Sequence, residues 1–291
     1  MKLGALEAGG TKMVCAIGDE SGKIFEQISI PTTKPEETMP PIIEYFKDKD
    51  IEALGVACFG PVDLDKSSDT YGYITSTPKI PWQNYDIVGT LKEALGCPVG
   101  FDTDVNGSLL GEATYGQAKG LTDAVYFTIG TGVGAGVMTN GKMLHGMMHP
   151  EFGHIRLVVR DDDPYKEGHC PFHGACLEGM AAGPAIEARW GAKGKELADR
   201  DEVWDLEAYY IAQACATSVF VLSPQMIILG GGVMHQEQLF PLVRKYTKEL
   251  IAGYIKTKQM EDLEHYIVPA SLNDDQGIMG CLKLALDAKN E

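Results

Sequence analysis

The chain has 291 residues, and 44% of them are hydrophobic, which is enough to bury a large core and fits roughly two domains better than one. Its 25 basic residues stand against 41 acidic ones, so the formal net charge is −16, with no stretch dense in Lys or Arg. Nucleic acids and anionic membranes are first bound through their phosphates, so both are poor candidate partners. No apolar run is long enough to span a membrane, and the N-terminus enters a strand pattern at once instead of a signal sequence, so we expect a cytoplasmic protein.

Short apolar strands alternate with helical patterns along the chain, which predicts an α/β protein. The expected strands cover residues 3–8, 12–18, 23–30, 52–58, 98–101, 124–129, 133–139 and 226–229, and the expected helices lie near 35–48, around 84–95 and from about 236 onward. Gly9-Gly10-Thr11 lies between the first two strands, and Gly130-Thr131-Gly132 lies between the two that open the second half. The same unit of strand, glycine-rich turn and strand is therefore predicted twice.

Glycine-rich turns can point several backbone N–H groups at a phosphate, because no β-carbon blocks its approach. Each turn could equally be a plain hairpin. Neither one matches the P-loop or the dinucleotide fingerprint, so a nucleotide held by two hairpins is the remaining phosphate-binding design. A third cluster, Gly230-Gly231-Gly232, follows a strand and is well placed for a base or ribose, although it could also be a bare strand-to-helix turn.

The segment Phe101-Asp102-Thr103-Asp104-Val105-Asn106 ends a strand and opens a helix. An Asp at this place is most often an N-cap, but two aspartates cannot both be the cap. One acid is therefore left free to accept a proton, as a carboxylate does when a sugar hydroxyl attacks phosphorus.

A loop of soft metal ligands lies in the second half. Cys170, His173 and Cys176 have Cys-x2-His-x2-Cys spacing, and a fourth ligand is available nearby, which suits tetrahedral zinc better than two unrelated thiols. Glu151 and Glu178 flank this cluster without fitting its spacing. The other five cysteines are expected to be small buried residues: Cys15, Cys58, Cys97, Cys215 and Cys281.

Several motifs, taken in order, resemble the repressor, open reading frame and kinase (ROK) family of sugar kinases. They are Glu7-Ala8-Gly9-Gly10-Thr11-Lys12, Thr103-Asp104-Val105-Asn106, the glycine-rich run 129–136, Glu151-Phe152-Gly153-His154 and the zinc loop. The resemblance covers nearly the whole chain, and the first and last motifs are similar to the bacterial fructokinase branch. It implies the actin-like ATPase fold of ribonuclease H-like and hexokinase-type proteins, with two α/β domains around a cleft. Residues 1–113 plus 272–291 would form the small domain, and 114–271 the large domain with the zinc loop.

The resemblance also implies an ATP-dependent hexose kinase that phosphorylates D-fructose at O6, with some activity on mannose. Asp104 matches the family's general base. The residues matched to ATP are Gly9, Gly10, Thr11, Lys12, Gly130, Thr131 and Gly132 for the phosphates, and Pro184, Gly231 and Gly232 for adenosine. Glu7 matches an acid that helps to hold Mg²⁺, which phosphoryl transfer needs between the phosphates.

Sugar binding is matched to Asp104, Asn106, Glu151, His154 and Glu178. His154 is also the expected fourth zinc ligand beside Cys170, His173 and Cys176, since one ring nitrogen can bind metal while the other donates to a hydroxyl. Four protein ligands would make this zinc structural. Family precedent further implies a homodimer.

The chain departs from the family pattern at three positions. Thr103 stands where many glucose-phosphorylating members carry Asn, which argues against glucose as the substrate. Among the expected metal ligands, His173 stands where many members carry Cys, and Glu7 stands where other members carry Asp. The alternatives are a glucokinase or other hexose or hexosamine kinase, and a non-catalytic zinc-stabilised sugar-binding protein. A sugar-responsive transcription factor is disfavoured, because the first turn begins at Gly9 and leaves no room for a helix-turn-helix. The charged segments 159–169 and 192–203 are expected to be solvated loops.

Overall fold

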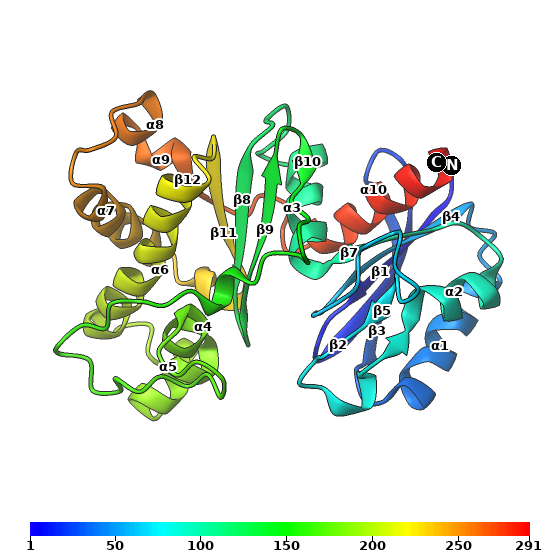
Figure 1. Cartoon of the computed structure of the whole chain (residues 1–291), viewed down its shortest axis with the longest axis horizontal. Helices are drawn as coiled ribbons and strands as arrows, with labels where there is room; N and C mark the ends of the chain where they lie inside the picture. Colours follow the sequence, from blue (N-terminus) through cyan, green and yellow to red (C-terminus); the bar gives the residue numbers. More distant parts are fainter. The chain divides into compact units, whose positions relative to one another are not determined.

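The computed structural model describes all 291 residues, and these form two compact units (Figure 1). The first unit comprises Met1–Gly120, Met143–Pro150 and Ser271–Glu291, and the second comprises Leu121–Lys142 and Glu151–Ala270. Compared with the expected domain boundaries, residues 114–120 and the short segment Met143–Pro150 pack with the first unit.

The first unit is built on a five-stranded sheet in the order β3-β2-β1-β4-β7. Its strands are β1 (Leu3–Ala8), β2 (Lys12–Gly18), β3 (Ile24–Pro31), β4 (Ala53–Cys58) and β7 (Val99–Thr103). The first three strands form an antiparallel meander, whereas β4 and β7 run parallel to β1. A small hairpin of β5 (Tyr73–Ile74) and β6 (Tyr85–Asp86) and the 3-10 helix η1 (Ile80–Trp82) follow β4.

Helices cover both faces of this sheet (Figure 1). On one face α1 (Pro35–Lys47) and α2 (Ile87–Leu95) pack with large side chains such as Phe46 and Leu91. On the other face α10 (Gln276–Asn290) packs through residues such as Ile278 and Leu282 onto mostly small residues of the sheet, and α3 (Asp104–Tyr115) lies against α10. A β-carbon on Gly111 or Gly280 would clash with the backbone of the other helix, so the two backbones approach closely.

The second unit repeats this plan with the sheet order β10-β9-β8-β11-β12. Its strands are β8 (Ala124–Ile129), β9 (Val133–Thr139), β10 (Lys142–Met143), β11 (Met226–Gly230) and β12 (Ile267–Pro269). As in the first unit, an antiparallel pair, β8 and β9, is followed by parallel strands. The predicted repetition of strand, glycine-rich turn and strand is thus confirmed.

Helices and short 3-10 turns complete the second unit: η2 (Phe152–His154), α4 (Leu177–Ala181), α5 (Gly183–Trp190), η3 (Gly194–Glu196), α6 (Asp201–Val221), η4 (Gly232–His235), α7 (Leu239–Ile251), α8 (Lys258–Glu261) and α9 (Leu263–Tyr266). The central helix α6 packs against α7 and α4 and is largely buried.

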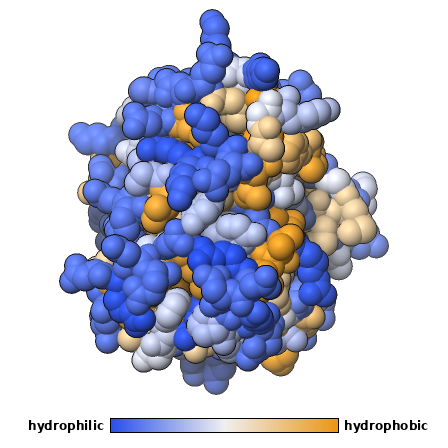
Figure 2. All heavy atoms as spheres, turned by 90° about the vertical axis from the view of Figure 1, so that its left-hand side faces the viewer, coloured by the Kyte–Doolittle hydropathy of each residue, from blue (hydrophilic) through white to orange (hydrophobic).

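Hydrophilic residues dominate the face shown in Figure 2, where apolar residues form separate patches. No helix is long and apolar enough to cross a membrane.

The expectation of solvated loops at 159–169 and 192–203 is wrong in part. Asp163 is completely buried, and Leu197 is buried with its carbonyl accepting a hydrogen bond from Trp204. Charge in the sequence predicted exposure, but Arg160, Asp162 and Asp163 of the first segment form ion pairs in the fold.

Candidate active site

The first glycine-rich turn joins β1 to β2. Two hydrogen bonds from Thr32 hold the backbone of this turn. The Thr32 hydroxyl donates to the Gly9 carbonyl at 2.7 Å, and its N–H donates to the Thr11 carbonyl at 3.0 Å. Thr11 and Lys12 are exposed, and Gly9 and Gly10 are half-buried. The turn therefore offers backbone N–H groups and a lysine to an anion.

Asp104 is the first residue of α3, and the helix is capped by its neighbour. The Thr103 hydroxyl accepts a hydrogen bond from the Asn106 N–H at 3.1 Å and caps α3. The prediction that an aspartate caps this helix is therefore wrong. Asp104 accepts from the N–H of Val105, at 2.9 Å. Burial raises the pKa of its carboxyl group to about 6. It is a carboxylate suited to accepting a proton near neutral pH.

Glu7 lies at the end of β1, close enough to Asp104 for the two charges to interact. Burial, and then the charge of Asp104, raise the pKa of Glu7 to about 7, while Lys12 lowers it. Two carboxylates in a poorly solvated place favour the approach of a divalent cation, and oxygen is the donor that Mg²⁺ prefers. The donor chemistry therefore fits the expected Mg²⁺ role of Glu7.

A polar cluster that the sequence did not predict lies beside Asp104. The buried Asp102 accepts from the side-chain amide of Asn106 at 2.7 Å, and its carboxylate lies 3.0 Å from Nε2 of His145. Asn106 is 1% exposed, and its amide nitrogen donates to Asp102 while its Oδ1 has no hydrogen-bond partner, so its expected contact with a sugar stays a prediction. His145 belongs to the segment Met143–Pro150, 39 residues further along the chain, so no local spacing pattern could reveal it.

The second glycine-rich turn joins β8 to β9. It is closed by a hydrogen bond from the Gly130 N–H to the Gly132 carbonyl at 2.9 Å, and the Gly183 N–H donates to the Gly130 carbonyl at 2.7 Å. Glu178 of α4 accepts from the Val133 N–H at 3.1 Å. One carboxylate oxygen of this predicted sugar-binding acid thus supports the second glycine-rich turn.

A cavity of about 530 Å³ opens beside this second turn. Its lining includes the predicted Gly130, Thr131, Pro184 and Gly232, together with Glu187, Lys193, Lys195, Trp204 and His235. Gly231 does not line the cavity. Its φ is +88°, and a β-carbon there would lie 2.5 Å from the Ile129 carbonyl oxygen, so this glycine shapes the turn behind the cavity wall.

The four predicted metal ligands come together. The ligand atoms of His154, Cys170, His173 and Cys176 all lie within 4.8 Å of one another. Nδ1 of His154 is 3.9 Å from the Cys170 sulfur and 3.6 Å from the Cys176 sulfur, and Nδ1 of His173 is 3.8 Å from the Cys170 sulfur. Zinc bonded to S at about 2.3 Å and to N at about 2.0 Å places neighbouring tetrahedral ligands about 3.6 Å apart. The cluster fits a zinc ion, and Nε2 of His154 is not directed at the sulfurs.

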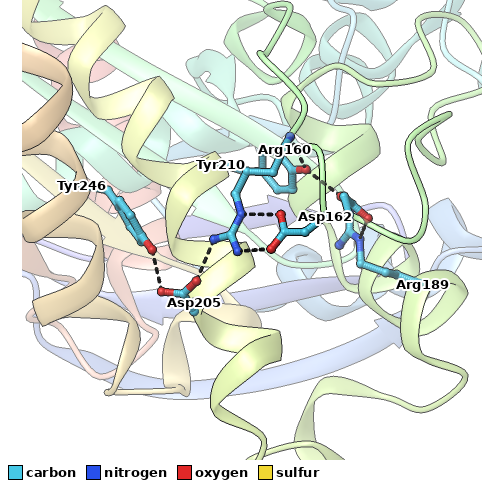
Figure 3. A network of polar contacts seen from close by, with 7 residues as sticks. Arg160, Asp162, Arg189, Asp205, Tyr210 and Tyr246 are labelled. Carbon is cyan, nitrogen blue, oxygen red and sulfur yellow. Dashed lines mark hydrogen bonds and ion pairs between the residues drawn. The ribbon is translucent and has the colours of Figure 1, made fainter.

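Polar contacts hold the segment that leads into this metal cluster (Figure 3). Arg189 binds Asp163 at 3.0 Å and donates to the Met180 carbonyl near the end of α4, and the Tyr210 hydroxyl donates to Asp163 at 2.6 Å. Nearby, Arg160 pairs with both Asp162 and Asp205, and Tyr246 donates to Asp205 (Figure 3). These contacts connect the segment to α4, α5, α6 and α7, so it is held by protein contacts outside the Cys/His cluster.

Comparison with known proteins agrees with these features. The family model described as the ROK family matches residues 3–288. A relative from Bacillus subtilis (strain 168) is 50% identical over 98% of this chain and 96% of its own length, and a Pediococcus pentosaceus protein named fructokinase is 46% identical over 98% of both. The solved ROK hexokinase from Thermus thermophilus matches with a TM-score of 0.80 and 27% identity, covering 100% of each chain. The expected actin-like ATPase fold is confirmed by this neighbour. The chain belongs to the ROK family.

Proposed function

We propose that this protein is a fructokinase, an ATP-dependent hexose kinase that converts D-fructose to fructose 6-phosphate. The observation that carries the proposal is Asp104, a carboxylate of raised pKa at the start of α3 in the same unit as the first glycine-rich turn. Relatives named fructokinase are 43% to 48% identical to this chain and support the choice of sugar.

Asp104 accepts the proton of the fructose 6-hydroxyl while O6 attacks the γ-phosphorus of ATP. The O6–P bond forms, the bond from the γ-phosphorus to the β,γ-bridging oxygen breaks, and its electron pair remains on ADP. Val105 N–H holds one carboxylate oxygen of Asp104, which leaves the other oxygen to take the proton. The helix begins at Asp104, so its positive N-terminal end favours the ionised base.

The two glycine-rich turns are assigned to the phosphates of ATP. Backbone N–H groups at Gly10 and Thr11 and at Thr131 and Gly132 can donate to phosphate oxygens, and the cavity beside Pro184 and Gly232 suits adenosine. Lys12 adds a positive charge at the first turn. Mg²⁺, when bound with ATP, neutralises charge between the phosphates, and Glu7 is the residue assigned to help hold it.

The zinc loop is assigned to sugar recognition. His154, Cys170, His173 and Cys176 would hold a structural zinc ion, since four protein ligands leave no position open for water. With its Nδ1 on the metal side, His154 can donate from Nε2 to a sugar hydroxyl. Glu151 and Glu178 are proposed to accept from further hydroxyls. A homodimer is also proposed, and light scattering of the purified protein at several concentrations checks it.

A kinetic panel tests the function. Purified protein with Mg-ATP is assayed on fructose, mannose, glucose and N-acetylmannosamine through coupled detection of ADP. Fructose should have the highest kcat/KM, with mannose next. A preference for glucose would favour the glucokinase alternative, whereas sugar binding without ADP release would favour the non-catalytic one.

A further inference from the structure

Lys79 is a cation that the family motifs do not include, yet it lies over the first glycine-rich turn. A methyl group placed on Gly10 would be 2.9 Å from Lys79 Cε and 3.6 Å from its Nζ. Both residues belong to the first unit. A phosphate held by the N–H groups of this turn would therefore lie within reach of the Lys79 ammonium group.

The ammonium group of Lys79 has no carboxylate partner. No Asp or Glu oxygen lies within 4.0 Å of it, although the protein carries 41 acidic residues. The ammonium group lies over the ring of Phe59, with Nζ 6.0 Å from the ring centre. A cation–π contact at this distance positions the charge without neutralising it.

The loop backbone that carries Lys79 is tied to the core by hydrogen bonds and packing. The buried Trp82 donates from its indole to the Thr33 carbonyl at 2.9 Å, and its ring packs edge-to-face on Phe59 at 5.9 Å. The Trp82 N–H donates to the Lys79 carbonyl at 2.8 Å, and Gln83 donates to the carbonyl of the buried Thr77 at 2.9 Å. The backbone of Lys79 is thus fixed beside the turn before any ligand binds, and electrostatic stabilisation of a transition state needs such preorganised groups.

We propose that Lys79 is a further catalytic residue of this kinase, and that its ammonium group contacts the phosphoryl group as it passes from ATP to the sugar. The proposal rests on the function proposed above. In the transfer, the O6–P bond forms and the bond to the bridging oxygen breaks, while charge spreads over the three equatorial oxygens of the phosphoryl group. Lys12, on β2, is assigned to ATP binding, and Lys79 acts on the charge of the transferring group.

The decisive variant is Lys79→Met, which keeps the length of the side chain and removes its charge. We expect kcat with fructose to fall about 100-fold, the usual effect of removing one fixed donor from a developing oxyanion. The Kd of Mg-ATP measured without sugar should change less than about threefold, and Lys79→Arg should recover at least about tenfold of the lost kcat. Lys92→Met, an exposed lysine of α2 in the same unit, is the matched control and should leave kcat unchanged.

Binding of a transition-state mimic separates catalysis from a structural role. ADP with aluminium fluoride and fructose should bind Lys79→Met about 100-fold more weakly than the wild type, because such mimics follow the loss in transition-state stabilisation. Melting temperature and zinc content should stay at the wild-type values. If Lys79→Met does not fold, Lys79→Gln takes its place in both measurements.

Three outcomes would overturn the inference about Lys79: a kcat within threefold of the wild type, an equal loss in the Kd of Mg-ATP, or unchanged binding of the mimic. A wild-type protein that releases no ADP with any sugar would instead refute the proposed function. The two failures are therefore distinguishable.

Discussion

Replacing Asp104 by Asn should abolish turnover and at the same time stabilise the fold. The folded protein holds the pKa of this carboxyl group at about 6, against an ordinary value of 3.8. One pKa unit corresponds to about 1.4 kcal/mol, so ionised Asp104 costs the folded state about 3 kcal/mol. The amide carries no charge and can still accept from the Val105 N–H.

The pH dependence of this gain follows from the direction of the pKa change. Below about pH 4 the carboxyl group is protonated in the folded and unfolded states, so Asp104→Asn should melt close to the wild type. As the pH rises from 4 to 6 the unfolded chain ionises first, and the wild type loses stability that the variant keeps. Above pH 6 the full difference is present, which is about 5 °C in melting temperature for a chain of this length.

Thermal melting at pH 4, 5, 6 and 7, with Glu44→Gln as an exposed control carboxylate of α1 in the same unit, measures this difference. In parallel, wild-type kcat/KM should fall about tenfold between pH 7 and pH 5, since the ionised fraction of a group with a pKa of about 6 falls from about 90% to about 9%. An Asn variant that is less stable at pH 7, or that retains near wild-type kcat, would refute the reasoning.

Three further predictions concern the surroundings of this base. Metal analysis should find about one zinc per chain, and Cys176→Ser should lose it and raise the KM for fructose at least about tenfold; zinc-free protein with an unchanged KM would contradict the role of the loop. Gly231→Ala should raise the KM for ATP about tenfold with a smaller effect on the KM for fructose, because the backbone at φ +88° has no room for a methyl group beside Ile129; equal changes in both constants would argue against it. The hydrogen bond to Asp102 raises the pKa of His145, so the stability that His145 adds should be complete below pH 6.5 and decline as the pH rises through the raised pKa. Melting of His145→Gln at pH 5.5 and 8.5 checks this, and a difference from the wild type that is larger at pH 8.5 would contradict it.

Short-range patterns in the sequence predicted much of the first unit and the metal loop. Alternating apolar residues around Gly9-Gly10-Thr11 predicted β1 and β2, because strand pairing and turn chemistry are set within a few residues. The spacing of Cys170, His173 and Cys176 predicted the cluster for the same reason: its ligands lie close along the chain. At the start of α3 several adjacent residues could cap the helix, and the sequence did not decide among them. The structure shows that the cap is Thr103 and not an aspartate.

Contacts between distant segments explain what the sequence could not predict. His145 contacts Asp102, which lies 43 residues earlier in the chain, and Lys79 lies beside Gly10. Asp163, in a segment predicted to be a solvated loop, forms an ion pair with Arg189. A charged residue looks the same in the sequence whether it is solvated or paired. Its burial depends on which segment the fold brings beside it.

The sequence by itself determined the family, the two repeated strand–turn–strand units and the identity of the candidate base and metal ligands, because these depend on residue type and local spacing. The tertiary structure alone decided the pKa of Asp104, the burial of Asn106 and the place of the unpaired Lys79. The electrostatic environment of a side chain is the sum of contacts made after the chain has folded, and it is this environment on which the proposed roles of Asp104 as a base and of Lys79 as a partner for phosphate depend.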